Sequence, residues 1–423
     1  MDKDYQYAFQ NSQHKSIQAQ LKQGVVSFNS PQDWDTGFIG LDIYATFTGY
    51  FAEPYVEIIN GQQRSILSFE RGVQGKRYIN LPSNTGNKNQ TIQLIGHHLR
   101  IKDQQANMVL FSNPKIHKQT KVLLIAPHPD DAEIAAFGLY SQHNSLILTI
   151  TAGEAGPHNY DEVYTDANQH YRTKGKLRVW DSITVPMLGG VSPEKAINLG
   201  YFDGTLQQMA KHKPQSVNSL YTGINNVNHF RQQNLSSLTP VTTGKANWTA
   251  LLDDLKQMLQ SYQPDIIVTP YPALDWHTDH KYSTVAVITA IKELGLQQGQ
   301  LFLYTNHLTE NNYFPYGQQG ELVPIPPDLN QSLYFDSIYS YQLPKPKAKI
   351  FALEAMHDLR LDTSWLTIPG AFKTLWKTLG NKLLLKDQTY FRRAIRENEL
   401  FLVVNFSSLY KTETLNSIRG KTK

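Results

Sequence analysis

A histidine and two adjacent aspartates stand close together in one short segment of the chain. The segment reads APHPDDAE and contains His128, Asp130 and Asp131. Imidazole and carboxylate groups are ligands for divalent ions, and both also transfer protons during hydrolysis. An aspartate at this place is also an ordinary helix cap, and a lone histidine is often a plain loop residue. The segment is therefore a candidate site that needs further ligands.

A second segment supplies the same residue types much later in the chain. It reads PALDWHTDHKYS and holds Asp275, His277, Asp279 and His280 within six positions. Histidine and carboxylate without thiolate suit zinc or another borderline divalent ion, and a catalytic ion takes three protein ligands and leaves a position for water. The chain has no cysteine, which excludes a cysteine-rich structural zinc site. Together the two segments predict metal-assisted hydrolysis, with surface or helix-capping histidines as the alternative.

Apolar strands and helices must position both segments. Residues 122–126 are a short, unbroken apolar run, which is typical of a parallel strand buried on both faces. Small and apolar residues recur at helical spacing from Ala132 onward, so the two aspartates fall at a helix N-terminus. Residues 266–269 are a second apolar strand, and residues 283–294 suit a helix. Because ligands of α/β proteins bind at the carboxyl ends of strands, we expect both segments to face one site.

Both segments, and two turns between them, resemble motifs of the LmbE-like, or PIG-L, family of metal-dependent N-acetylglucosaminyl deacetylases. Residues 126–133 are similar to the family's A-H-P-D-D-E motif, and residues 277–280 to its His-x-Asp-His motif. Residues 151–156 resemble its T-x-G-E-x-G turn and residues 199–204 its L-G-x-x-D-G turn. The four stand in the family's order within residues 121–361. The resemblance implies a Rossmann-like, doubly wound, mostly parallel sheet.

The chain departs from the family pattern at three positions. Pro127 is inserted between the alanine and the histidine of the first motif, and Ala132 between the aspartate pair and Glu133. Both insertions lie outside the His-x-Asp-Asp core, so they retain the ligands but displace the glutamate. Some relatives carry a tyrosine two residues before the first histidine of the second motif, where this chain has Asp275.

The resemblance implies a role for each residue of the two motifs. It implies that His128, Asp131 and His280 are the ligands of Zn²⁺, with Fe²⁺ or Mn²⁺ as alternative ions. Asp130 would be the general base, which takes a proton from water and passes it to the leaving amine. His277, protonated and held by Asp279, would stabilise the oxyanion.

Four further residues are predicted to contact the substrate. Arg178 and Arg172 follow the T-x-G-E-x-G turn, where relatives place an arginine that meets the sugar or phosphate of the substrate. Arg178 is preferred because its neighbours continue a compact segment, whereas Arg172 stands in a more polar one. Glu154 and Asp203 come from the two turns, although Asp-Gly is also the ordinary composition of a tight turn.

The first third of the chain has a different pattern. Apolar and polar residues alternate over residues 41–48, and similar short runs recur up to residue 111 with turn residues between them. The pattern predicts an all-β antiparallel sandwich over residues 25–113. We expect an N-terminal extension over residues 1–24, a linker over residues 114–120 and a deacetylase-like domain over residues 121–423.

Composition limits the kinds of partner. A net charge of +4 without a long basic run does not suggest nucleic acid. The first residues lack the apolar core of a signal peptide, and no stretch reaches the roughly 18 apolar residues that span a bilayer. We therefore expect a cytoplasmic location. Residues 371–423 hold eleven Lys/Arg against four Asp/Glu, and residues 375–386 mix apolar with basic side chains, which favours peripheral contact with the inner membrane. Such a helix also suits packing on its own domain. The oligomeric state is not indicated.

The sequence thus predicts a bacterial-type, zinc-dependent enzyme that removes the acetyl group from an N-acetylglucosamine-type amino sugar or its glycan, lipid or nucleotide conjugate. The acetyl-sugar part of this prediction comes from the resemblance alone. Two alternatives stay open at this point. One is a metal-dependent amidase or esterase that acts on another acylated glycan precursor or natural product. The other is a non-catalytic glycan-binding protein.

Overall fold

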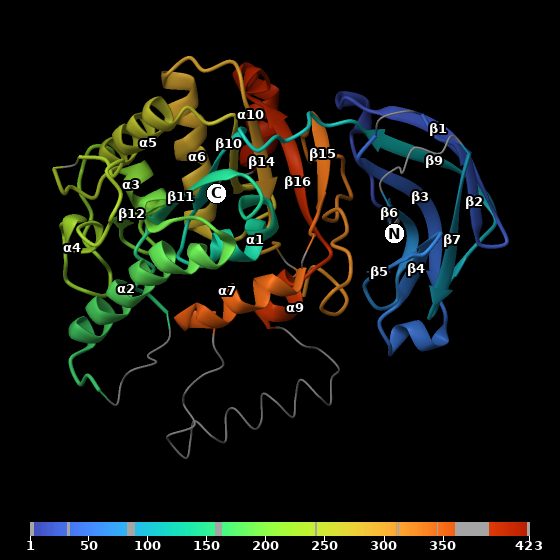
Figure 1. The fold of residues 1–423 in the computed structure, drawn as a ribbon, viewed down its shortest axis with the longest axis horizontal. Coiled ribbons are helices and arrows are strands. Elements are labelled where there is room, and N and C mark those ends of the chain that lie inside the picture. The colour runs from blue at the N-terminus through green and yellow to red at the C-terminus, as the bar shows by residue number, and fades with distance from the viewer. Residues whose placement is uncertain are drawn as a thin grey trace.

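The computed structural model describes residues 4–31, 34–82, 89–156, 163–241, 243–309, 311, 313–344, 346–359 and 389–420. Figure 1 shows two sheets, an N-terminal one in blue and a second one that helices cover. The basic, apolar segment at residues 375–386 lies outside the described residues.

The N-terminal sheet is antiparallel, as the alternating pattern predicts. Its strand order is β5-β4-β7-β2-β1-β9-β3-β6, with β8 paired to β3. The strands are β1 (Lys15–Lys22), β2 (Val25–Asn29), β3 (Thr36–Ala45), β4 (Tyr55–Asn60), β5 (Gln63–Ser68), β6 (Gln74–Leu81), β7 (Asn89–His97), β8 (Leu99–Ile101) and β9 (Gln104–Phe111). The predicted all-β region before the α/β region is confirmed.

The sheet begins earlier than the sequence pattern indicates. β1 precedes residue 25 and pairs with both β2 and β9, so the expected boundary falls between two paired strands. Residues further upstream are also packed, since Tyr7 and Phe9 are buried and Phe9 lies 5.8 Å from Phe335, ring centroid to ring centroid. Ile17, Ala19 and Leu21 alternate with polar residues in this stretch, so it carries a strand pattern that the predicted boundary left out of the sheet.

The second sheet is mixed and mostly parallel, as expected. Its order is β12-β11-β10-β13-β14-β16-β15, in which the first five strands are parallel neighbours and the last two pair antiparallel. The strands are β10 (Lys121–Ala126), β11 (Asn144–Thr151), β12 (Ala196–Tyr201), β13 (Ile266–Pro270), β14 (Gln300–Tyr304), β15 (Ser337–Gln342) and β16 (Asn398–Asn405).

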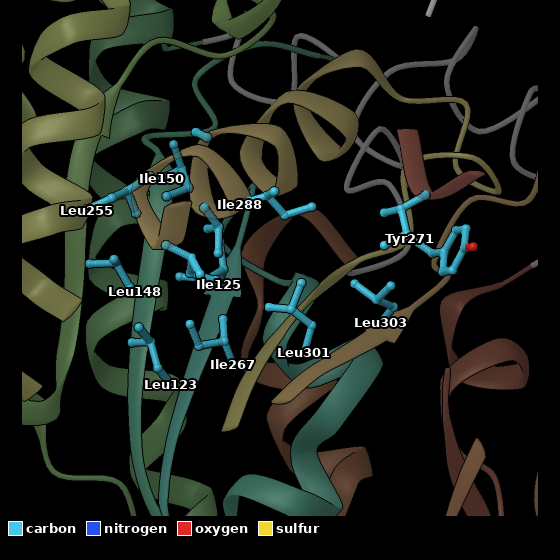
Figure 2. Close-up of a cluster of buried hydrophobic side chains, with 14 of the residues drawn as sticks. Leu123, Ile125, Leu148, Ile150, Leu255, Ile267, Tyr271, Ile288, Leu301 and Leu303 are labelled. Atoms are coloured by element: carbon cyan, nitrogen blue, oxygen red, sulfur yellow. The ribbon is translucent and has the colours of Figure 1, made fainter. Parts of the chain in front are cut away.

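Helices cover both faces of the second sheet. They are α1 (Asp131–Tyr140), α2 (Ala167–Thr184), α3 (Leu206–Lys211), α4 (Asn228–Arg231), α5 (Trp248–Tyr262), α6 (Thr278–Glu293), α7 (Lys349–Ala355), α9 (Tyr390–Ala394) and α10 (Thr412–Arg419). Leu123 and Ile125 of β10 pack with Leu255 of α5 and Ile288 of α6, as Figure 2 shows. The alternate β10 residues pack with α1 and α7 on the other face. The strand is therefore buried on both faces, which its unbroken apolar run predicts.

The two sheets share a hydrophobic core. Phe38, Val109 and Phe111 of the first sheet cluster with Phe335 and with Ile338 of β15 in the second. Polar contacts join the same surfaces, because Ser340 N donates to Thr36 Oγ1 at 2.9 Å and Asn113 Nδ2 donates to the carbonyl of Ile338 at 2.9 Å. The first sheet is thus packed against the second along β15, not tethered by a linker alone.

Candidate metal centre and active site

The carboxyl ends of neighbouring parallel strands meet at one edge of the second sheet. The loop after β10 carries the first motif, and the loop after β13 carries the second. β12 leads into the turn that contains Asp203, and β14 leads into a loop at residues 305–309. Because these strands run in the same direction, all four loops lie at the same end of the sheet, where α/β proteins bind ligands.

Three donor atoms form a compact triangle at this edge. His128 Nδ1 lies 3.4 Å from Asp131 Oδ2 and 3.3 Å from His280 Nε2, and His280 Nε2 lies 3.2 Å from Asp131 Oδ2. Donor atoms bound about 2.1 Å from a zinc ion would stand about 3.4 Å apart in a tetrahedral site. The side chains are at most 10% exposed. The donor set and its spacing therefore fit one divalent ion.

The remaining ring nitrogen of each histidine of the triangle faces carboxylates. His280 Nδ1 lies 2.9 Å from Asp275 Oδ2, and His128 Nε2 lies 3.2 Å from Asp203 Oδ1 and 3.4 Å from Asp279 Oδ2. A histidine that binds a metal commonly donates its other N–H to a carboxylate, which fixes the ring and its tautomer. These contacts orient Nδ1 of His128 and Nε2 of His280 toward the centre of the triangle.

The carboxylates also set the protonation of the histidines. Burial alone would lower the pKa of His280, but Asp131 and Asp275 outweigh it and raise that pKa to about 10. Burial opposes protonation of His128 too, and Asp203, Asp131 and Asp279 raise its pKa well above the usual value. An ion must displace these protons when it binds, since only the neutral imidazole is a ligand.

Asp130 lies beside the triangle and pairs with Arg178. Arg178 Nη2 donates to Asp130 Oδ2 at 3.0 Å, and Arg178 Nη1 donates to the carbonyl of Gly153 at 2.8 Å. Burial raises the pKa of Asp130 to about 6, and the guanidinium of Arg178 limits the rise. A carboxyl group with a pKa close to neutrality both accepts and returns a proton at neutral pH.

The structure does not show the predicted pairing of His277 with Asp279. Asp279 accepts hydrogen bonds from the backbone amides of Gly204 at 2.6 Å and Leu206 at 3.1 Å, and its Oδ2 faces His128. His277 Nδ1 is buried without a hydrogen-bond partner among the described residues. Burial, together with the charges of His128 and His280, lowers the pKa of His277 to about 4, so the ring is neutral at pH 7. Asp279 therefore contacts His128 and the turn after β12, and the lowered pKa of His277 favours its neutral form.

The four residues that were predicted to contact the substrate have different surroundings in the structure. Arg178 reaches Asp130, whereas Arg172 is exposed and donates to the carbonyl of Thr222 at 2.9 Å. Glu154 is fully buried, and its two oxygens accept from Ser219 Oγ at 2.7 Å and from the amide of Asp203 at 3.1 Å. Glu154 therefore holds the turn that contains Asp203 through a hydrogen bond to its backbone. Asp203 itself faces His128, so its observed contact is with a candidate ligand.

Sequence reasoning missed several residues around the site. Asn306 Nδ2 donates to Asp131 Oδ1 at 2.7 Å, and His307 lies next to it with its ring centroid 5.1 Å from that of His280. Asp358 Oδ2 lies 3.2 Å from Arg178 Nε and 3.3 Å from the buried Lys174 Nζ. These residues stand alone in the sequence, outside any motif. The one local signal for Asn306 and His307 was their place shortly after the apolar run of β14, separated from it by Thr305.

Comparison with known families agrees with this site. Residues 123–291 match the family described as PIG-L, GlcNAc-PI de-N-acetylase. The matched region contains the ligand triangle, Asp130 and Arg178, and it belongs to an α/β protein with a candidate metal centre at its strand ends. The chain therefore contains a PIG-L domain, which supports deacetylase activity in general. No match was found among the curated proteins.

Similarities to solved structures are weak. The 4-carboxy-2-hydroxymuconate hydratase GalB from Pseudomonas putida KT2440 has a TM-score of 0.34 and 9% identity over 67% of this chain and 95% of its own. A family two carbohydrate esterase from Cellvibrio japonicus has a TM-score of 0.18 and 8% identity over 71% and 91% of the two chains. The baseplate tripod of bacteriophage Tuc2009 has a TM-score of 0.16 and 12% identity over 27% and 72%.

Within the part of the chain that the structure describes, no helix combines the length and the apolar character that crossing a bilayer requires.

Proposed function

We propose that the chain is a metal-dependent hydrolase that removes the acetyl group from the nitrogen of an N-acetylglucosamine-type amino sugar or its conjugate. One observation carries the proposal. A triangle of two imidazole nitrogens and one carboxylate oxygen, with sides of 3.2 to 3.4 Å, lies beside Asp130 within a PIG-L domain. Zinc is the proposed ion, and Fe²⁺ or Mn²⁺ would suit the same donors.

His128, Asp131 and His280 would hold the ion. When bound, a divalent ion supplies Lewis-acid polarisation of the amide carbonyl and makes water a stronger acid. Neighbouring side chains hold these ligands in place. Asp275, Asp203 and Asp279 fix the two rings, and Asn306 holds Asp131 Oδ1 so that Oδ2 faces both histidines.

Asp130 would transfer the proton. Its Oδ2 is held by Arg178, so Oδ1 is the atom that takes a proton from the attacking water. Burial raises the pKa of Asp130 to about 6, so the carboxylate is largely ionised at pH 7 and yet basic enough to accept a proton. The same atom then returns the proton to the nitrogen of the leaving amine, which departs as the amino sugar.

His277 would stabilise the negative charge on the carbonyl oxygen. A neutral imidazole still carries one N–H, and that N–H donates a hydrogen bond to a developing oxyanion. The ring stands next to His128, with 4.6 Å between centroids and nearly perpendicular planes. This role replaces the protonated His277 that the sequence suggested.

Acetate release tests the proposal. The protein, loaded with zinc, would be offered free, nucleotide-linked, lipid-linked and polymeric N-acetylhexosamines. We expect one class to release acetate, and Asp130→Asn to lose most of this activity. Asp166→Asn is the matched control, because Asp166 is an exposed helix cap whose role asparagine fills equally well. No acetate release by the zinc-loaded wild type from any member of the panel would contradict an acetyl-sugar substrate.

A further inference from the structure

The loop after β14 is fastened to both motif loops. Asn306 Nδ2 donates to Asp131 Oδ1 at 2.7 Å, which ties the loop to the first motif. The amide of Trp276 donates to the carbonyl of His307 at 3.1 Å, and Leu308 forms an isolated β-bridge with Asp275, which tie it to the second. A loop held at three successive residues keeps the side chain of His307 in a defined place.

That place is beside the ligand triangle. One ring nitrogen of His307 lies within 4.8 Å of a ligand atom of Asp131 and of a ring nitrogen of His280, and those atoms also lie within 4.8 Å of each other. The ring is packed edge-on against Tyr390, with 6.1 Å between centroids, and lies 5.6 Å from the ring of Trp276. Its nitrogens have no hydrogen-bond partner among the described residues, so no visible polar contact accounts for a half-buried imidazole here.

His277 is the other histidine near the triangle, and its surroundings differ. It groups with His128 and His280 and not with Asp131. His307 instead groups with the carboxylate, the one ligand of the triangle that carries a negative charge. Asn306 occupies Asp131 Oδ1, which leaves Oδ2 on the side that the histidines face. The two remaining histidines therefore flank different edges of the triangle.

We propose that His307 is a fourth protein ligand of the ion held by His128, Asp131 and His280. The inference rests on the proposed metal-dependent function and adds to it a ligand from the loop after β14. A third imidazole would tighten binding of the ion, which would then need a fifth position to keep room for water, and His277 would stay available to meet the substrate.

Metal affinity of the full chain tests this proposal without reference to activity. Metal-free protein would compete with a chromophoric chelator for Zn²⁺. Outer contacts to a metal ligand are typically worth about 10- to 100-fold in affinity, so loss of a direct ligand in His307→Ala should weaken Zn²⁺ binding by at least about tenfold. His277→Ala should change it less than about threefold. His212→Ala, at an exposed position, is the control for loss of a surface imidazole.

X-ray absorption of the zinc-loaded protein gives an independent count of bound imidazoles. We expect three in the wild type and two in His307→Ala, with His307→Gln as a second variant if the alanine variant folds poorly. Unchanged affinity and an unchanged imidazole count in a folded His307 variant would overturn the proposal and leave the proposed function intact. Tight Zn²⁺ binding by His280→Ala would instead overturn the metal site itself.

Discussion

Asp275 should control metal affinity although it is not a candidate ligand. Its two carboxylate oxygens have different partners. Oδ2 lies 2.9 Å from His280 Nδ1, and Oδ1 accepts a hydrogen bond from the amide of His277 at 2.9 Å. The side chain is fully buried. In Asp275→Asn only one oxygen remains, so one of these two donors must face an NH₂ group. The substitution therefore weakens the hold on His280 while it nearly preserves shape.

The expected magnitude follows from comparable contacts. Loss of a carboxylate behind a metal-bound histidine costs about 10- to 100-fold in affinity, or about 1.4 to 2.7 kcal/mol. Competition with a chromophoric chelator measures this change in Zn²⁺ binding. Asp265→Asn is the matched control, because Asp265 precedes the same strand at the opposite end and accepts from the amide of Lys121 at 2.8 Å. Equal affinities of Asp275→Asn and Asp265→Asn would refute the reasoning.

Three further predictions concern proton transfer, stability and domain packing. Arg178→Gln should move the acidic limb of the pH–activity profile to higher pH, because the guanidinium lowers the pKa of Asp130, while Arg178→Lys should move it less. Burial raises the pKa of Glu133 to about 8, well above the roughly 4.3 of an unfolded chain, so folding stability should fall by up to about 1.4 kcal/mol per pH unit between these values. Glu133→Gln should remove this loss, which urea unfolding at pH 5 and pH 8 measures. Deletion of residues 1–113 should abolish cooperative thermal unfolding, because Phe38 and Phe111 complete a core shared with the second sheet.

Each of these predictions has a contradicting result. An unmoved acidic limb in Arg178→Gln would mean that Arg178 does not set the basicity of Asp130. If the folding stability of Glu133→Gln falls with pH as steeply as that of the wild type, a group other than Glu133 causes the pH dependence. A fragment of residues 114–423 that unfolds cooperatively and releases acetate would show that the first sheet is an independent module.

The sequence predicts the parts of the site that lie in contiguous motifs. His128 and Asp131 are three residues apart at the start of α1, and His280 lies in the first turn of α6. Each motif thus follows a buried strand and opens a helix, which is a pattern that local sequence carries. The strand runs were equally readable, because β10 and β13 are short apolar segments with helices after them.

Contacts between distant segments were not readable. Whether Asp279 faces His277 or His128 depends on the turn after β12, whose amides at Gly204 and Leu206 capture its carboxylate. Glu154 looks like a site residue in sequence, yet it is fully buried and its oxygens accept hydrogen bonds from Ser219 Oγ and from the amide of Asp203. Tertiary hydrogen bonds decide these contacts, and the sequence carries no periodic pattern that predicts them.

Zinc occupancy and acetate release, measured together, test the central claim most directly. Metal-free protein would be titrated with Zn²⁺ in the presence of the substrate class that the panel identifies. We predict that acetate release rises in proportion to bound zinc up to one equivalent, and that Asp130→Asn binds the same equivalent and releases little acetate. Acetate release that is independent of bound zinc, or an Asp130→Asn variant that is fully active, would contradict the account.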